Sequence, residues 1–229
     1  MYPLSRRALA EFIGTLALIF IGAGSILSDR LAGGDVSLVG IALAHGLTIA
    51  VMVSAFGHIS GAHLNPAVTV GALVANKISP VDAAVYWISQ LAGGVSGALL
   101  LTLVFDSATR QAANLGTPGL GAGVTVGQGL VFEMVATFFL VIVVCATAID
   151  PRGAFKVVAG LPIGLVITFD ILAGGPLTGA SMNPARTFGP AAVGGFWANH
   201  WIYWVGPLVG GAIAGILYST FFLRRSDVA

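Results

Sequence analysis

Residues 179–190 read G-A-S-M-N-P-A-R-T-F-G-P and follow a long apolar stretch of the chain. Asn is a favoured residue immediately before a helix, and Pro is favoured at the first helical position. Asn183-Pro184 therefore predicts a helix start. The apolar residues that follow suffice for a helix of about 11 residues, or about 16 Å, which is half the thickness of a bilayer. The same segment carries Arg186, a permanent cation in a chain with only ten Lys and Arg residues.

A second segment of this kind lies in the first half of the chain, where residues 58–74 read H-I-S-G-A-H-L-N-P-A-V-T-V-G-A-L-V. Asn65-Pro66-Ala67 precedes Asn183-Pro184-Ala185 by 118 residues, so a second half-length helix is expected after Asn65. Further pairs at similar offsets are Gly46 with Gly164, Glu11 with Glu133, and Y-W-I-S-Q-L-A-G-G from Tyr86 with Y-W-V-G-P-L-V-G-G from Tyr203. We interpret residues 1–229 as a single domain that contains two internal repeats, about 8–105 and 127–223.

The composition is that of a membrane protein. The chain of 229 residues is 57% hydrophobic and 8% charged, with a mean hydropathy of +0.96, whereas soluble domains carry about 25% charged residues. No basic block suggests a nucleic-acid partner. Stretches long and apolar enough to span a bilayer lie at about 8–28, 38–57, 80–105, 127–149, 157–176 and 200–223.

These observations predict the fold class: an all-α membrane protein with six transmembrane helices plus two re-entrant half-helices. Each repeat contains three full spans, an odd number, so the second repeat must enter the membrane from the opposite face. The result is an inverted repeat about an axis in the membrane plane. The two half-helices then enter from opposite sides, and their Asn-Pro ends meet at the midplane.

The distribution of basic residues predicts the orientation, because cytoplasmic loops carry an excess of Lys and Arg. With both termini in the cytoplasm, seven basic residues lie inside and two outside, and Arg186 belongs to neither group. Those inside are Arg6, Arg7, Lys77, Arg152, Lys156, Arg224 and Arg225, and those outside are Arg30 and Arg110. The absence of N-glycosylation sequons and the short tails favour a bacterial inner membrane.

Non-helical backbone at membrane depth is tolerated only where it is buried in protein or lines a wet cavity. The segments before the two Asn-Pro pairs are of this kind, and their carbonyl groups are expected to line a pore: Gly61, Ala62, His63, Leu64, Gly179, Ser181 and Met182. Two helix N-termini at the centre would repel cations, including a hydrated proton. The amides of Asn65 and Asn183 would donate to a passing oxygen and break a chain of oriented waters.

The paired motifs resemble the major intrinsic protein family, the aquaporins, from Ala8 to about Leu223. The resemblance implies six tilted helices, two half-helices, one pore per subunit and a homotetramer. It also implies a passive water channel in the lipid bilayer, with water and small neutral solutes as its partners, and not an enzyme. No catalytic constellation, metal-ligand spacing or cofactor motif is present in the sequence, so no cofactor is expected.

In that family a selectivity filter is built from one position on the second span, one on the fifth span and two in the second half-helix loop. Matching motif to motif places His45, Ile171, Ala180 and Arg186 there. Water-strict members usually have Phe and His at the first two positions. This sequence departs from that pattern, with His on the second span, Ile on the fifth and a small third side chain. The combination is similar to that of tonoplast intrinsic proteins and of aquaporins that pass ammonia and hydrogen peroxide, so both solutes are expected to permeate together with water.

The remaining ionisable groups in the spans receive different interpretations. Glu11 and Glu133 occupy matching repeat positions and are expected to brace the two loop backbones, as the resemblance implies. The roles of Asp170, one residue before the filter isoleucine, and of His58 stay open.

Two other functions are weighed. A glycerol facilitator typically has Asp after the second Asn-Pro-Ala-Arg and a basic residue after Gly-Pro. Thr187 and Ala191 stand there instead, so glycerol is less favoured. An ion-coupled secondary transporter, a different class, also uses inverted repeats and broken helices. It would need carboxylates that bind a coupling ion, whereas Glu11 and Glu133 are interpreted as braces.

Overall fold

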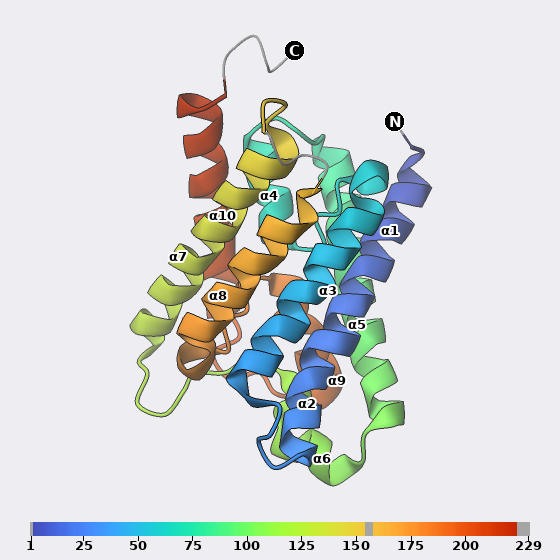
Figure 1. Cartoon of the computed structure of the whole chain (residues 1–229), viewed down its shortest axis with the longest axis vertical. Helices are drawn as coiled ribbons and strands as arrows, with labels where there is room; N and C mark the ends of the chain where they lie inside the picture. The colour runs from blue at the N-terminus through green and yellow to red at the C-terminus, as the bar shows by residue number, and fades with distance from the viewer. Residues whose placement is uncertain (1, 154–157, 224–229) are drawn as a thin grey trace.

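Helices account for most of residues 2–153 and 158–223, which the computed structural model describes (Figure 1). Within these residues, six helical stretches are long and apolar enough to cross a membrane. This confirms the predicted all-α class. In chain order they are Leu4–Leu31, made of α1 (Leu4–Ala17), the π-helical turn η1 (Leu18–Ala23) and α2 (Gly24–Leu31); α3 (Ser37–Ser60); α5 (Pro80–Val104); Val126–Ile149, made of α7 (Val126–Val144) and the π-helical turn η3 (Cys145–Ile149); α8 (Gly160–Thr178); and α10 (Ile202–Phe221).

The boundaries agree with the predicted spans to within about four residues. The largest difference is at α1, which begins at Leu4 because polar Ser5-Arg6-Arg7 continues the helix. The sequence did not indicate the two π-helical turns, since a widened turn leaves no mark in an almost uniformly apolar stretch. Part of the predicted fifth span and the basic residues Lys156, Arg224 and Arg225 lie outside the described residues.

Two short helices follow the Asn-Pro pairs. They are α4 (Pro66–Val74), of 9 residues, and α9 (Pro184–Gly194), of 11 residues. Each has extended backbone at the preceding Asn and Pro at its first position, as the capping rule predicts. A short helix α6 (Ser107–Ala112) and the 3-10 turn η2 (Asn114–Gly116) lie in the connection between the halves.

The second half repeats the element order of the first: two long spans, a half-helix and a third long span. Helix α1 packs along α5 within the first half, and α7 packs along α10 within the second. The two halves join where α3 packs along α8. Glycines permit this close approach, because a Cβ atom added at Gly46 would lie 2.5 Å from the carbonyl oxygen of Gly164 on the facing helix.

The start of α1 and the end of α10 lie at the same end of the bundle, and α6 lies at the other (Figure 1). At the first end, Asp150 follows η3 and accepts hydrogen bonds from the side chains of Arg152, at 2.7 and 3.0 Å, and of Tyr218, at 3.0 Å. The Arg152 guanidinium holds the pKa of the Asp150 carboxyl well below its usual range. These contacts tie the connection after η3 to the last turn of α10.

Replacing Gly46 by Ala should destabilise the chain, because the added methyl group would collide with the backbone of α8. Overpacking of this kind costs about 1–3 kcal/mol. Gly57→Ala is the matched control on the same helix, since no atom lies within 4 Å of an added Cβ there. Thermal unfolding in detergent should show a lower Tm for Gly46→Ala and an unchanged or higher Tm for Gly57→Ala. Equal Tm values for the two variants would contradict this account of the α3–α8 contact.

Candidate functional site

The two Asn side chains that precede α4 and α9 each serve two purposes. The Oδ1 atom of Asn65 accepts from the backbone N–H of Ala67 at 2.8 Å, and that of Asn183 accepts from Ala185 at 3.0 Å and Arg186 at 3.2 Å. These bonds cap the helices. The Nδ2 atom of Asn65 donates to the carbonyl of Met182 at 2.8 Å, and Nδ2 of Asn183 donates to the carbonyl of Leu64 at 2.9 Å.

The reciprocal bonds show how the two half-helix segments are held together. Each amide crosses to the non-helical segment of the other half, so the caps of α4 and α9 meet inside the bundle. An Asn amide has two N–H groups, and the cross-bond uses one of them. One N–H of each Asn therefore remains for a molecule between the two caps.

The non-helical segments have an unusual backbone. Ala62 and Leu64, on either side of His63, have φ of 46° and 52°, and Ala180 and Met182, on either side of Ser181, have φ of 43° and 53°. Left-handed conformation costs about 1–2 kcal/mol for a residue with a Cβ atom. Such strain persists only where the surroundings enforce it.

Two buried carboxylates enforce this conformation. Glu11 accepts from the backbone N–H of His63 at 2.9 Å and of Leu64 at 2.6 Å. Glu133 accepts from the backbone N–H of Ser181 at 2.9 Å and of Met182 at 2.7 Å. Both glutamates are fully buried, and neither lines the cavity described below.

Hydroxyl and amide groups complete each brace. Ser60 and Gln90 donate to Glu11 at 2.7 and 2.8 Å, and Thr178 donates to Glu133 at 2.7 Å. The Tyr86 and Tyr203 hydroxyls donate to the carbonyls of Ser60 and Thr178 at 2.7 and 2.8 Å. The sequence interpretation assigned no role to these residues, although the repeated Tyr-Trp pair was a signal that could have found the two tyrosines.

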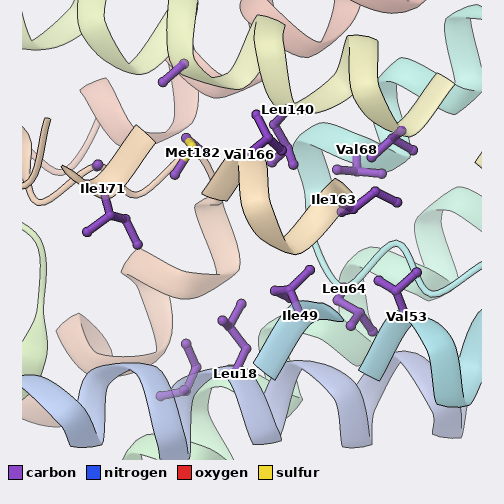
Figure 2. Packing of buried hydrophobic residues seen from close by; sticks show 14 of the residues in the cluster. Leu18, Ile49, Val53, Leu64, Val68, Leu140, Ile163, Val166, Ile171 and Met182 are labelled. Atoms are coloured by element: carbon purple, nitrogen blue, oxygen red, sulfur yellow. The ribbon is translucent and has the colours of Figure 1, made fainter. Parts of the chain in front are cut away.

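A narrow cavity runs between the two halves and has about 30 Å³ of space for the centres of water molecules. This is enough for water and little more, since one water needs about 10–15 Å³ measured in this way. Much of its wall is apolar. Figure 2 shows Ile49 and Val53 of α3 on one side, and Leu140 of α7 with Ile163 of α8 on the other.

The cavity brings together most of the residues that the sequence singled out. All four expected filter residues line it, and so do both capping Asn residues. From the two non-helical segments it is lined by Gly61, Ala62, His63, Ala180, Ser181 and Met182. Leu64 and Gly179, which were also expected along the pore, are not part of its wall, and the Leu64 carbonyl instead accepts from Asn183.

Arg186 is buried and held from two sides. Its Nη1 donates to the carbonyl of Gly116 in η2 at 2.9 Å, and its Nη2 lies 3.3 Å from Nε2 of His45. Among the described residues it forms no salt bridge. The partner Gly116 was missed at the sequence level, because the connection that contains it has no motif.

His45 is oriented by the same contact. Its Nδ1 lies 2.9 Å from the carbonyl of Ile41, and a carbonyl can only accept, so Nδ1 carries the proton. In the neutral ring Nε2 then has a free lone pair, which accepts from Arg186. Protonation at Nε2 would remove this acceptor and set an imidazolium against the guanidinium. The geometry therefore favours neutral His45.

Three other polar residues lie near the cavity with different surroundings. His63 lines it and contacts Thr69 Oγ1 through Nδ1 at 3.1 Å. His58 does not line it but faces two wider cavities, of about 580 and 380 Å³, that continue from His63. Asp170 is buried outside the cavity wall, and its Oδ2 has no hydrogen-bond partner among the described residues.

Sequence comparisons show extensive similarity to one family. The sequence profile described as Major intrinsic protein matches residues 2–218. Aquaporin TIP1-2 of Zea mays is 49% identical over 227 residues, which cover 96% of this chain and 87% of the relative. Aquaporin TIP4-4 of Zea mays is 47% identical, and Aquaporin TIP1-1 of Arabidopsis thaliana 46%, each over 96% of this chain and 88% of the relative.

A solved structure, the X-ray structure of the aquaglyceroporin from Plasmodium falciparum, matches with a TM-score of 0.89. The match covers 99% of this chain and 100% of the other. The sequence identity is 23%, so this likeness bears on the fold alone.

Replacing Glu133 by Gln should weaken the second brace, because an amide nitrogen would face one of the backbone N–H groups that now donate to the carboxylate. A buried donor left without an acceptor costs about 1–3 kcal/mol. We expect a lower Tm in detergent and a lower water permeability in proteoliposomes measured by stopped-flow light scattering. Asp35→Asn, at an exposed carboxylate, is the control. A Glu133→Gln variant with unchanged Tm and permeability would contradict the bracing role.

Proposed function

Because the chain belongs to the major intrinsic protein family and is a multi-pass membrane water channel, not an enzyme, we propose that water crosses it in single file between the caps of α4 and α9. We further propose that the pore excludes protons and ions and admits ammonia and hydrogen peroxide. The observation that carries this proposal is the single narrow cavity that both Asn caps and His45, Ile171, Ala180 and Arg186 line together.

Proton exclusion follows from the groups at the centre of this cavity. The N-termini of α4 and α9 each contribute about half a positive charge, and each Asn amide keeps one N–H after its cross-bond. A water between the caps accepts through its oxygen, so its hydrogens point outward on both sides. Neighbouring waters then have opposite orientations, and a continuous proton wire is interrupted.

The proposed filter adds a second barrier to cations and sets the size limit. Arg186 is a permanent cation on the cavity wall without a salt-bridge partner among the described residues. Ile171 and Ala180 line the same cavity as the polar pair His45 and Arg186, and they supply an apolar side chain and a small one. A neutral solute slightly larger than water, with hydrogen-bonding groups, fits this combination.

The structure offers less support for the two alternative functions. A secondary transporter would need carboxylates that bind a coupling ion, but Glu11 and Glu133 are saturated by donors of the loops and lie outside the cavity wall. A glycerol facilitator is not supported by likeness to the Plasmodium aquaglyceroporin, because that likeness concerns the fold. The narrow cavity favours smaller solutes.

Proteoliposomes test the solute range. With no ion gradient, a sucrose challenge should produce fast and weakly temperature-dependent water flux, and ammonia and hydrogen peroxide should enter above the rates of empty liposomes. His45→Phe with Ile171→His, which installs the residues usual in water-strict relatives, should retain water flux and lower the entry of both solutes about tenfold, equivalent to about 1.4 kcal/mol of barrier. Water flux that required an ion gradient would overturn the channel mechanism. Normal water flux without ammonia or peroxide entry would overturn the wider solute range.

We also propose that the chain forms a homotetramer. Apolar side chains stand exposed along α3 and α8 at helical spacing, and the lipid bilayer or another copy must cover them. They are Val39, Leu43, Leu47 and Val51 on α3, and Leu161, Leu165, Phe169 and Leu172 on α8. Light scattering of the detergent-solubilised protein should give a protein mass of four 23.2 kDa chains. A monomer mass in several mild detergents would contradict the tetramer.

The orientation proposed is that both termini lie in the cytoplasm. Arg6 and Arg7, at the start of α1, lie at the same end of the bundle as Arg152 beside the last turn of α10, and this positive charge supports the orientation. Tags at either terminus should be accessible from the cytoplasmic side alone. The relatives compared are plant proteins, so they do not support the bacterial inner membrane that the sequence alone suggested.

A further inference from the structure

Gly22 lies against the imidazole ring of His45. A Cβ atom added at Gly22 would be 2.6 Å from Cδ2 and 2.7 Å from Nε2 of His45, well inside the contact distance of two heavy atoms. The ring of His45 therefore occupies the space that any side chain at position 22 would need. Gly22 itself is buried within the first span and does not line the cavity.

The ring cannot move aside without changing the filter. Nδ1 of His45 is held by the carbonyl of Ile41, and Nε2 accepts from Arg186. The edge that a new Cβ would strike, from Cδ2 to Nε2, is the edge that contacts Arg186. A side chain at position 22 would push this edge away from the first span and disturb the contact with the guanidinium.

The second half of the chain shows the opposite arrangement. By the offset that relates Glu11 to Glu133, Gly22 corresponds to Val144, and by the offset that relates Gly46 to Gly164, His45 corresponds to Ile163. Val144 and Ile163 both line the cavity. In the second half, two aliphatic side chains of moderate size occupy this pair of positions. In the first half, the same pair consists of a glycine and the large polar ring at the filter.

The local backbone is also unusual. Gly22 belongs to η1, the π-helical turn that spans Leu18–Ala23, whereas the corresponding residues of the second half are α-helical up to Val144, and η3 begins only at Cys145. A π-helical turn shifts the helical register of the residues that follow, and single turns of this kind often mark functional sites. Here the turn brings a residue without a side chain to face the filter.

We propose that Gly22 is a specificity-determining position of this channel. Because it has no side chain, it seats His45 against Arg186 and keeps the ring clear of the solute path. Any larger residue at position 22 displaces the ring, removes the acceptor of Arg186 and narrows the filter. This inference rests on the proposed filter and adds to it a residue on the first span.

A double-mutant cycle between positions 22 and 45 tests the inference in proteoliposomes. Gly22→Ala should lower hydrogen peroxide permeability about tenfold, while water permeability, which needs a smaller opening, falls less. His45→Ala removes the ring that Gly22 accommodates. In that background Gly22→Ala should change the peroxide-to-water permeability ratio less than about twofold, because the two positions are in contact and their effects are not additive.

Gly24→Ala is the matched control, because it adds the same methyl group two residues further along, where the Cβ meets only Leu101 Cδ2, at 3.2 Å. It should leave the permeability ratio at the wild-type value. The inference is overturned if Gly22→Ala keeps the wild-type ratio, or if it has the same effect with and without the His45 side chain. A merely structural role of Gly22 would change the amount of folded protein without changing this ratio.

Two further outcomes separate this inference from the proposed function. If Gly22→Ala does not fold, adding His45→Ala should restore folded protein, and this double variant should have the peroxide-to-water permeability ratio of His45→Ala alone. A double variant that does not fold, or one with a different ratio, contradicts the inference. If the wild-type channel passes no hydrogen peroxide, that part of the proposed function fails. The cycle is then evaluated from water permeability and Tm, where additive effects of the two substitutions would overturn the role of Gly22.

Discussion

The hydrogen bonds that Glu11 and Glu133 accept from loop backbones support the whole central region. Backbone N–H groups at membrane depth cannot turn to water, and each one left unsatisfied costs several kcal/mol. The segments before α4 and α9 leave the helical ladder, and their left-handed residues add strain. A carboxylate with two oxygens satisfies two adjacent N–H groups at once. The same braces leave the carbonyl groups of these segments free to bond elsewhere.

Those carbonyl groups then connect the two halves. The Asn65 and Asn183 amides each donate to a carbonyl of the opposite segment, so neither cap can shift without the other. This arrangement positions Arg186, whose backbone N–H is part of the second cap. Its guanidinium bridges the Gly116 carbonyl and His45. The proposed filter thus depends on the same buried network as the centre of the pore, although the filter residues come from distant parts of the chain.

Several features were predicted from the sequence and others were not. The all-α class and the six spans are confirmed, and the expected filter residues lie on one cavity. Repetition made this possible, since two Asn-Pro motifs at matching positions carry far more information than one. Gly116, the two π-helical turns and the contact of Gly22 with His45 were not anticipated. A single glycine in an apolar span can serve many different structural purposes. Its neighbours across the bundle cannot be read from the residues beside it in the chain.

Local chemistry therefore determined the elements, and tertiary structure decided how they act together. Hydropathy and length define the spans, and capping preference defines the half-helices, because these properties depend on residues close in the chain. The acceptors of Arg186 and the walls of the cavity depend on contacts between residues more than 60 positions apart. Such contacts form only when the helices pack. In a bundle this dense, the space left by a glycine determines the position of a neighbouring side chain as much as a contacting side chain does.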